Sequence, residues 1–449
     1  MKVLLISSNT LTEPYPIYPI GLDYVINAIS PPHLVKAIDL NEIKGGSALI
    51  SILADYIPDI IGISIRNVDN ADGTSVKTFI GEMASLIRLI RQNSKGLIIL
   101  GGSGFTIFPS EIMNYLDADF SIIGEGEKLA YLLKALEHNE PIPNIHGIVT
   151  RRGPIIFPKP LSEIPCRYTI PHHTYTSFYL KRGGMLNIQT KRGCPFQCVY
   201  CVYPHIEGKR FRFMQPDDVA RTAKMLQDAG AKYLYITDST FNGSYTHSMN
   251  VARAIKKAGV SIPWGGFFTP TNPPPDYYQI LANAGLTHVE FGTEALDNSV
   301  LKAHKKPFLR EDVFASHGMA IAAGIHVAHY LMLGGPGETE DTLNETLSST
   351  DQLKKSVFFV FTGVRIYPKT ALYELALKEG QIDLHTNLLE PTFYWSRALN
   401  REIATQIIKD RVDNRINWIL GSGSPQMFKV VARLHKRGYV GPLWEHLIR

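Results

Sequence analysis

Residues 1–150 alternate short apolar runs with segments whose apolar positions recur at helical spacing. The runs are nearly continuous, as expected of parallel strands buried on both faces, and they are KVLLIS (2–7), LVKAID (34–39), DIIGISI (59–65), GLIILGG (96–102) and DFSIIG (119–124). The segments between them suit amphipathic helices, and they are GLDYVINAI (21–29), GGSALISILADYI (45–57), TSVKTFIGEMASLIRLIRQ (74–92) and PSEIMNYL (109–116). We therefore predict a doubly wound α/β domain over residues 1–150.

Ligands of such a sheet bind at the carboxyl ends of its strands. The residues predicted there are Ser7, Ser8 and Asn9 after the first strand, Arg66, Asn67 and Asp69 after the third, and Gly101, Gly102, Ser103 and Gly104 after the fourth. The GGSG turn lets backbone amides approach a ligand closely. A further turn, GEGE, places Glu125 after the fifth strand, where carboxylates also favour the start of a helix. No GxGxxG follows the first strand, which argues against a nicotinamide dinucleotide.

The alternation restarts near residue 186 with six further strand and helix units. The expected strands are LNIQT (186–190), YLYITD (233–238), IPWGGFF (262–268), THVEFGT (287–293), VAHYLML (327–333) and FFVFTGVRIY (358–367). Six consecutive units predict a partial (β/α)6 barrel over residues 186–380, whose chemistry belongs at the strand carboxyl ends. Residues 151–185, which include Cys166, form a linker in this prediction, and residues 381–449 form a small, mostly helical region.

Composition places the chain among folded intracellular proteins. An apolar fraction of 45% and a charged fraction of 19% over 449 residues do not indicate disorder. The first apolar run is too short for a signal peptide, and no segment reaches the roughly 18 apolar residues of a membrane helix. We therefore expect a cytoplasmic protein. The net charge of +5 is mild, so no nucleic acid partner is expected, and the basic stretch 426–449 suits a solvated helix or contact with a membrane surface.

Three of the four cysteines, Cys194, Cys198 and Cys201, follow the first strand of the second half. A structural zinc site needs four ligands, no second Cys pair exists, and His205 stands at an unusual distance for a Cys3His site. Three thiolates would instead leave one iron of a [4Fe-4S] cluster open to another ligand. The spacing thus favours a cluster with an open iron.

The pattern Cys194-x3-Cys198-x-Tyr200-Cys201 resembles the signature of radical S-adenosylmethionine (radical SAM) enzymes. Later segments follow that family in order, namely YLYITDSTFN with Asp238, VEFGTEAL with Glu294, LMLGGPGET, and GVRIYP with Arg365. The resemblance implies that the three cysteines hold a [4Fe-4S] cluster whose open iron chelates SAM. It further implies SAM contacts at Tyr200, Glu294, Gly334, Gly335, Glu338 and Tyr367, and it assigns no catalytic side chain.

A doubly wound domain ahead of this barrel resembles the cobalamin-binding subfamily of radical SAM enzymes. GISIRNVDN, GGSGFTIFPSEI, GEGE and NIHGIVTRRG look like the first half of that subfamily. The resemblance implies cobalamin contacts at Ser8, Asn9, Arg66, Asn67, Gly101, Gly102, Ser103 and Glu125. The Asp-x-His-x-x-Gly triplet of other cobalamin domains does not occur in this sequence, which leaves the lower axial ligand of cobalt open.

By this resemblance the protein is a methyltransferase. It would place the methyl group of methylcobalamin on an unactivated carbon, after a 5'-deoxyadenosyl radical has removed a hydrogen atom. The alternatives are a cobalamin-dependent ring-forming or rearranging enzyme, a non-catalytic iron-sulfur sensor or carrier, and a first domain that has lost its ligand. A methylthiotransferase is disfavoured because no cysteine precedes Cys166.

The substrate expected from the sequence is a lipid or a secondary metabolite. The residues that suit an apolar cavity for it are Phe267, Phe268, Tyr330, Phe393, Tyr394 and Trp395. The family resemblance also implies a one-electron donor such as flavodoxin or ferredoxin.

Overall fold

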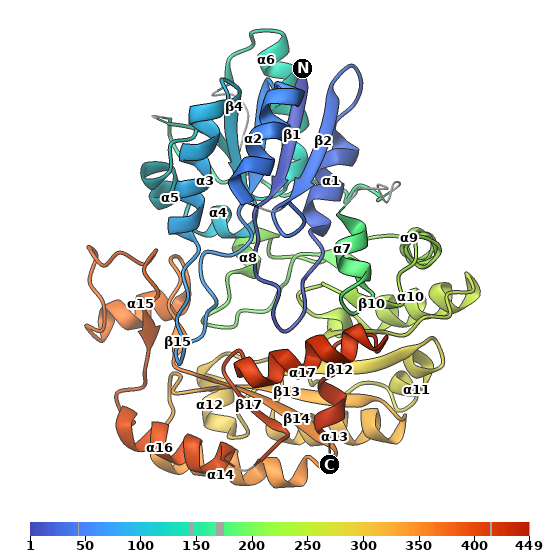
Figure 1. Ribbon diagram of the computed structural model, residues 1–449. Helices are drawn as coiled ribbons and strands as arrows, with labels where there is room; N and C mark the ends of the chain where they lie inside the picture. Colours follow the sequence, from blue (N-terminus) through green and yellow to red (C-terminus); the bar gives the residue numbers. More distant parts are fainter. Residues whose placement is uncertain (44, 143–146, 152, 168–174, 414, 449) are drawn as a thin grey trace.

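The computed structural model describes residues 1–43, 45–142, 147–151, 153–167, 175–413 and 415–448, and it places two parallel sheets one above the other (Figure 1). The first domain contains β1 (Lys2–Ser7), α1 (Ile20–Ala28), β2 (Leu34–Asp39), α2 (Gly45–Tyr56), β3 (Ile60–Ser64), α3 (Ile80–Asn93), β4 (Leu97–Gly101), α4 (Ser103–Ile107), α5 (Pro109–Tyr115), β5 (Phe120–Ile122), α6 (Leu129–Glu137) and β6 (Ile148–Thr150). Part of the NIHGIVTRRG segment, residues 144–146 and 152, lies outside the described residues.

The first sheet has the order β2-β1-β3-β4-β5-β6, and only β6 is antiparallel to its neighbour. Its strands are buried apolar runs, because α1 and α6 cover one face while α2, α3 and α5 cover the other. The predicted strands and the doubly wound class are confirmed. Helix α3 starts at Ile80 and not at residue 74, because residues 66–79 form a loop in which Asp69 bridges to Thr78.

The second half builds a sheet of seven parallel strands in the order β17-β14-β13-β12-β11-β10-β7. Its main elements are α7 (Thr176–Leu180), β7 (Met185–Ile188), α9 (Pro216–Asp228), β10 (Tyr233–Ile236), α10 (Tyr245–Lys257), β11 (Trp264–Phe268), α11 (Tyr277–Ala282), β12 (Leu286–Glu294), α12 (Asn298–Ala303), α13 (Arg310–Ala322), β13 (His326–Leu333), α14 (Glu340–Ser349) and β14 (Ser356–Thr362). Two small antiparallel sheets of two strands each lie beside it. One pairs β8 (Lys191–Arg192) with β9 (Arg212–Phe213), and the other pairs β15 (Val364–Arg365) with β16 (Phe393–Tyr394). The six predicted strands are present, but the last divides at Gly363, whose φ of 70° turns the chain away from the sheet.

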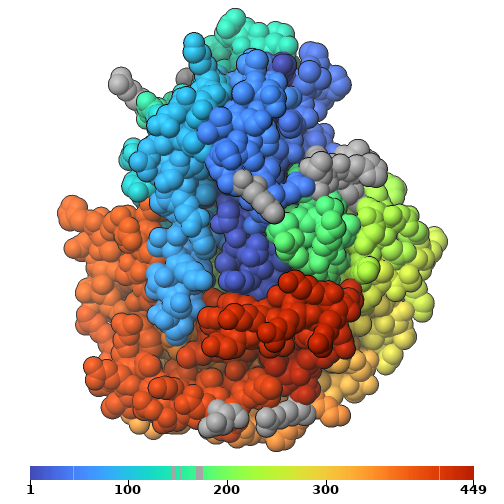
Figure 2. All heavy atoms as spheres, in the orientation of Figure 1, coloured from blue at the N-terminus to red at the C-terminus, as the bar shows by residue number. Residues whose placement is uncertain are grey.

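The C-terminal region is mostly helical, as predicted, and it also contributes a strand. After α15 (Ala371–Lys378) it contains α16 (Arg401–Val412), β17 (Trp418–Leu420) and α17 (Pro425–Lys436). The strand β17 pairs in parallel with β14, so this region supplies a seventh strand of the barrel sheet as well as helices. Helix α17 lies across the lower body below the first domain, where Met427 packs against Trp444 and Ile419 (Figures 1 and 2). None of the described helices has the length and hydropathy needed to span a bilayer.

Buried ion pairs and hydrogen bonds join the two halves. Three carboxylates of the first domain each have a partner from later in the chain, and these pairs are Asp23 with Arg167, Asp39 with Tyr179 (2.8 Å) and Asp69 with Arg365 (2.9 Å). Removal of the partner of a buried carboxylate lowers the free energy of unfolding by several kcal/mol. The strand ends of the first domain are therefore held in a fixed position above the barrel.

Two histidines in the barrel wall generate a prediction about acid stability. His317 Nδ1 lies 3.1 Å from His329 Nε2, and burial lowers the pKa of both rings, that of His317 to about 4. A depressed folded-state pKa gives stability that is present above pH 6.5 and lost as the pH falls toward 4. We expect the stability advantage of the wild type over His317→Asn to shrink by about 2 kcal/mol between pH 7 and pH 5, as measured by chemical unfolding.

The matched control is His385→Asn, because His385 is exposed in a loop. This variant should follow the wild type over the same pH range. A His317→Asn curve parallel to the wild type would contradict the assignment of the acid sensitivity to this pair.

Candidate active site between the two domains

The cysteine loop follows β8 and ends at the short helix α8 (Tyr203–Ile206). Its first turn needs Gly193, because φ is 86° and a Cβ would stand 2.1 Å from the Arg210 carbonyl oxygen. All three cysteines are free thiols, and Cys194 is buried while the other two are half-buried. Burial raises the pKa of each thiol, that of Cys201 to about 12. Deprotonation here therefore requires a strong positive charge such as iron.

The thiols fit an iron-sulfur cluster by the chemistry of their surroundings. The pKa of Cys201 responds to the charges of Cys198 and Cys194, so the three groups share one environment. Backbone N–H groups of Phe196 and Tyr203 lower the pKa of Cys194 and Cys201 respectively by donating to their sulfurs. Within the described ranges, no three His, Cys, Asp or Glu side chains surround a point where one metal ion would fit. Each cysteine of a cluster binds a different iron, so such convergence is not required.

His205, which the zinc alternative needs as a fourth ligand, is exposed on α8.

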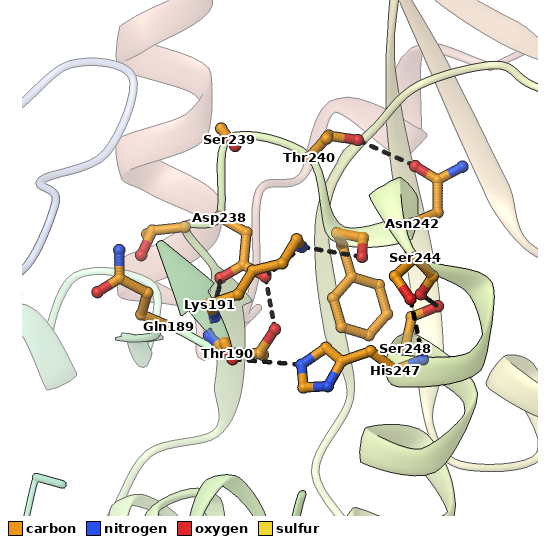
Figure 3. Close-up of polar contacts among 12 residues, drawn as sticks. Gln189, Thr190, Lys191, Asp238, Ser239, Thr240, Asn242, Ser244, His247 and Ser248 are labelled. Carbon is orange, nitrogen blue, oxygen red and sulfur yellow. Dashed lines mark hydrogen bonds and ion pairs between the residues drawn. The ribbon is translucent and has the colours of Figure 1, made fainter. Parts of the chain in front are cut away.

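Asp238 fixes the segment after β7 that leads into the cysteine loop (Figure 3). Its carboxylate accepts hydrogen bonds from Thr190 N (2.7 Å) and Thr190 Oγ1 (2.5 Å), and it forms an ion pair with Lys191 Nζ (2.8 Å). The His247 ring, whose Nε2 lies 3.2 Å from the Thr190 carbonyl oxygen, closes the network from α10. Both side chains of the Lys191–Asp238 pair are fully buried. Asp238, the last residue of the YLYITD segment, therefore anchors the loop.

A second buried network contains two of the predicted SAM residues. Tyr200 donates its hydroxyl hydrogen to Glu294 Oε1 (2.7 Å), and Lys306 Nζ lies 3.1 Å from the same oxygen. Glu294 has the left-handed φ of 63° at a bulge of β12, which directs its carboxylate off the strand line. The Lys306 charge opposes, without cancelling, the rise in the pKa of Cys198 that burial causes. Tyr200 and Glu294 are thus brought together beside the cysteines, with a lysine that the sequence analysis did not identify.

The GGPGE turn is shaped by Glu338. Its buried carboxylate accepts the backbone N–H groups of Gly334 and Gly335, and burial raises its pKa to about 7. Both glycines are needed for packing, because a Cβ would meet Trp395 at 2.7 Å at Gly334 and His304 at 2.2 Å at Gly335. Glu338 therefore directs its carboxylate at its own turn and fixes the shape of that turn.

Tyr367 lies apart from this network. Its ring stands 6.1 Å from that of Phe108 of the first domain, with the Arg365 guanidinium 4.9 Å from its centre. Tyr367 thus packs at the junction of the two domains.

A cavity of about 460 Å³ lies between the strand ends of the first domain and the upper rim of the barrel. The predicted cobalamin residues that line it are Asn9, Arg66, Asn67, Gly101, Gly102, Ser103 and Glu125. The barrel contributes Asn187, Gln189, Arg192 and Thr237, and the chain directly after Cys201 contributes Val202, Tyr203 and Ile206. The cavity therefore borders both domains and the cysteine loop at once.

Two details of this cavity differ from the expectation. Ser8 is not among the lining residues, because its hydroxyl donates to the Ser64 carbonyl oxygen (2.8 Å), and Ser7 takes its place. Gly102 serves packing, since its φ is 101° and a Cβ would lie 2.5 Å from the Ile65 carbonyl oxygen. At Gly101 a Cβ would meet nothing closer than 3.9 Å, so the missing side chain leaves space at the cavity wall.

Glu125 combines a place in the cavity wall with a structural role. Its carboxylate accepts from Arg192 Nη1 (2.9 Å), Arg212 Nη1 (2.8 Å) and Leu161 N (2.5 Å). Arg192 also pairs with Glu127 (2.7 Å) and is nearly fully buried. The acidic GEGE turn of one domain thus clamps the arginine that precedes Cys194 in the other. The signals for this contact were the opposite charges of GEGE and KRGC, but nothing in the sequence placed them side by side.

The comparisons with known proteins agree with this geometry. A model described as the B12 binding domain matches residues 7–133, and a model of the radical SAM superfamily matches residues 188–349. The chain therefore belongs to the radical SAM enzymes that carry a cobalamin-binding domain ahead of the barrel. Both parts of the family resemblance are confirmed.

The relatives of this chain include methyltransferases and methylthiotransferases. The chain is 26% identical to an uncharacterized methyltransferase of Pyrococcus horikoshii over 80% of this chain and 78% of that one. It is 24% identical to the tryptophan 2-C-methyltransferase of Streptomyces laurentii over 71% of this chain and 65% of that one. The chain also superposes on the structure of the radical SAM methyltransferase TsrM from Kitasatospora setae, which has cobalamin and a [4Fe-4S] cluster bound. The TM-score is 0.88 at 23% identity, and the match covers 99% of this chain and 97% of that one. The two proteins therefore share a fold.

The cysteine loop yields a prediction about iron content. Cys194→Ser, Cys198→Ser and Cys201→Ser should each lose most of the roughly four irons per chain that the reconstituted wild type binds, because each removes one of three ligands. Iron and sulfide analysis with the visible spectrum measures this. Cys166→Ser is the control and should keep the full complement, and a loss in this variant as large as in the other three would overturn the assignment of ligands.

Asp238→Asn tests the anchor of the loop. The change leaves the Lys191 ammonium buried without its carboxylate, so the free energy of unfolding should fall by about 3 to 5 kcal/mol. The control is Asp228→Asn, which removes one partner of an exposed pair with Lys224 and should cost less than about 1 kcal/mol. Equal effects in the two variants would show that the buried pair does not support the fold.

Proposed function

We propose that this protein transfers a methyl group from SAM to a carbon atom of a small-molecule substrate bound between its two domains. The observation that carries the proposal is the shared cavity, which the strand ends of the first domain and the residues directly after Cys201 line together. Two cofactors held by separate domains can act on one substrate only where both reach a common space. Binding in such a space supplies the positioning and the exclusion of water on which selectivity depends.

Each half of the chain would hold its own cofactors. Cys194, Cys198 and Cys201 would hold the cluster, with SAM beside Tyr200, Glu294 and the Gly334–Gly335 backbone. Asn9, Arg66, Asn67, Gly101 and Ser103 would surround cobalamin. When bound, the cluster supplies the electron that cleaves SAM and cobalamin supplies a methyl carrier, so a carbon without a lone pair becomes reactive.

The chain's own groups fit this role electrostatically. The Arg66 side chain faces the cavity, and burial lowers its pKa. In the described part of the chain it forms no ion pair with a carboxylate, so it remains available to the amide and phosphate oxygens of a large cofactor. Lys306 brings a buried positive charge to the cysteines, which favours the ligands in their thiolate form.

The second candidate function is a ring-forming or rearranging reaction without methyl transfer. It would use the same cofactors and the same cavity, so only the product separates the two reactions. Methyl transfer is favoured by the names of two relatives, a tryptophan 2-C-methyltransferase and a cytidylyl-2-hydroxyethylphosphonate methyltransferase.

The substrate and partners follow from the same proposal. We expect a secondary metabolite or a lipid as substrate, a flavodoxin or ferredoxin as electron donor, and a reducing compartment such as the cytoplasm. Contact with a membrane surface through residues 426–449 is a weaker expectation, because α17 packs part of its apolar side against the barrel.

The test is anaerobic and uses SAM with a deuteriated methyl group. The wild type, reconstituted with cluster and cobalamin and supplied with a reductant that generates cob(I)alamin, should place the label on cobalamin before any substrate is added, and mass spectrometry should detect deoxyadenosine once substrate is present. Cys198→Ser is the matched control, which should bind cobalamin but release no deoxyadenosine. Deoxyadenosine without label on cobalamin would favour the ring-forming candidate, and failure to bind cobalamin would refute the role of the first domain.

A further inference from the structure

A second cavity opens to the surface beside the cysteine loop. Its volume is about 300 Å³, and it lies between the turn after β5, the helix α8 and the linker segment 157–160. It shares Gly124, Glu125 and Ile206 with the larger cavity between the domains. Several residues of its wall are exposed, so a molecule in solution can reach it. Apart from Glu125, none of the cofactor residues named above lines it.

Three lysines line this cavity, Lys128, Lys209 and Lys369, and we call it the basic cavity. Lys209 and Lys369 are exposed at its rim, while Lys128 is only 6% exposed and donates to the Lys159 carbonyl oxygen (3.3 Å). In the part of the chain that the structure describes, none of the three lysines forms an ion pair with a carboxylate. The carboxylate in the wall, Glu125, already accepts from two arginines and a backbone N–H. The basic cavity therefore carries positive charge without a compensating anion.

This charge acts on the His205 ring, which lies in the same wall. Burial lowers the pKa of His205, and the charges of Lys209 and Lys369 add to this effect. The Lys369 ammonium lies 3.4 Å from the centre of the Phe157 ring, which holds it at the rim. Glu111 offsets part of the Lys369 charge without forming an ion pair with it. A place that disfavours a proton in this way attracts an anion.

Both lysines of the rim belong to segments that hydrogen-bond directly to the cysteine loop. The Cys194 N–H donates to the carbonyl oxygen of Gly208 (3.0 Å), the residue before the first of them. Three residues after the second lysine, the Leu372 N–H donates to the Val199 carbonyl oxygen (2.8 Å). The basic cavity thus opens directly beside the three proposed cluster ligands.

The proposed reaction needs an electron at this place. Each cleavage of SAM takes one electron from the cluster, and protein side chains do not replace it, so a separate reductant must deliver it. The rate of electron transfer falls steeply with the distance between two redox groups. A protein donor must therefore dock where the cysteines come close to the surface.

We propose that the basic cavity and its rim are the docking surface for an acidic one-electron donor protein of the flavodoxin or ferredoxin kind. One carboxylate of the donor enters the cavity toward Lys128, and others meet Lys209 and Lys369 at the rim. Ile156 and Phe157, which are 44% and 37% exposed, supply apolar contact area beside these charges.

The step at this surface is a simple electron transfer. The donor loses one electron and is oxidised, the cluster gains that electron and is reduced, and no bond or proton changes place. The inference rests on the proposed function, because it names the partner that serves the same cluster.

Binding is measured by calorimetry, with an oxidised flavodoxin and an oxidised [2Fe-2S] ferredoxin titrated into the anaerobic, cluster-loaded protein. At least one should bind, and its Kd should rise at least about fivefold between about 50 and about 300 mM NaCl, because salt screens charges at an exposed interface. No binding of either donor, or binding that does not respond to salt, would overturn the proposal. Binding of inorganic pyrophosphate without binding of either donor would show that the cavity serves a small anion instead.

Charge reversal at the rim assigns the surface. Lys209→Glu and Lys369→Glu should each weaken donor binding about five- to tenfold, which corresponds to about 1 to 1.4 kcal/mol. Lys128→Met removes the charge inside the cavity and should weaken binding about three- to tenfold. The control is Lys257→Glu, which should bind as the wild type does. Lys257 is exposed in the last turn of α10, which leads into the start of β11, so it lies at the opposite end of the barrel from the cysteine loop.

The rate of cluster reduction separates a docking role from a structural one. In stopped-flow absorbance the reduced donor should reduce the double variant Lys209→Glu/Lys369→Glu at least about tenfold more slowly than the wild type. Reduced methyl viologen, a small cation that needs no docking surface, should reduce the variant no more slowly than the wild type. Equal rates with the protein donor would mean that this surface is not the docking site. Labelling of cobalamin by SAM with a chemical reductant needs no protein donor, so it continues if only this inference fails and stops if the proposed function fails.

Discussion

The position of the cysteine loop relative to the first domain depends on the buried guanidinium of Arg192. Arg192 stands two residues before Cys194, and its charge is shared between Glu125 and Glu127 of the other domain. Neither carboxylate has enough exposure for water to replace the arginine. The two domains therefore meet through a contact that is directional as well as strong, and the distance between the cobalamin-binding face and the cysteines follows from this ion pair.

Several acidic residues of the sequence motifs act on the protein and not on a ligand. Asp238 anchors the entry of the cysteine loop, Glu338 shapes the turn after β13, and Glu125 clamps Arg192. In each case the carboxylate accepts hydrogen bonds from backbone N–H groups or cationic side chains that would otherwise lack a partner. A motif of this kind preserves the shape of a site.

The sequence predicted most of the fold, and it is also the source of the proposal that the three cysteines hold a cluster. Strands buried on both faces leave long apolar runs, and three clustered cysteines have few structural uses, so both signals are local. Long-range contacts left no such signal. Lys306 reaches Glu294 from beyond α12, and β17 is three residues long with only the apolar Trp418, Ile419 and Leu420 to mark it. Ser8 was placed on the cavity because a strand end does not reveal which of two adjacent serines turns inward.

The pairing of β17 with β14 has a consequence for synthesis. Residues 418–447 are made after every other strand of the barrel sheet, yet they protect the β14 edge and supply Trp444, whose Nε1 donates a hydrogen bond to the buried Glu290 of β12. Until they emerge, β14 presents an unpaired edge that invites association with other chains. The barrel sheet is therefore completed only when nearly the whole polypeptide has been made, and this short strand is the last piece that closes its edge.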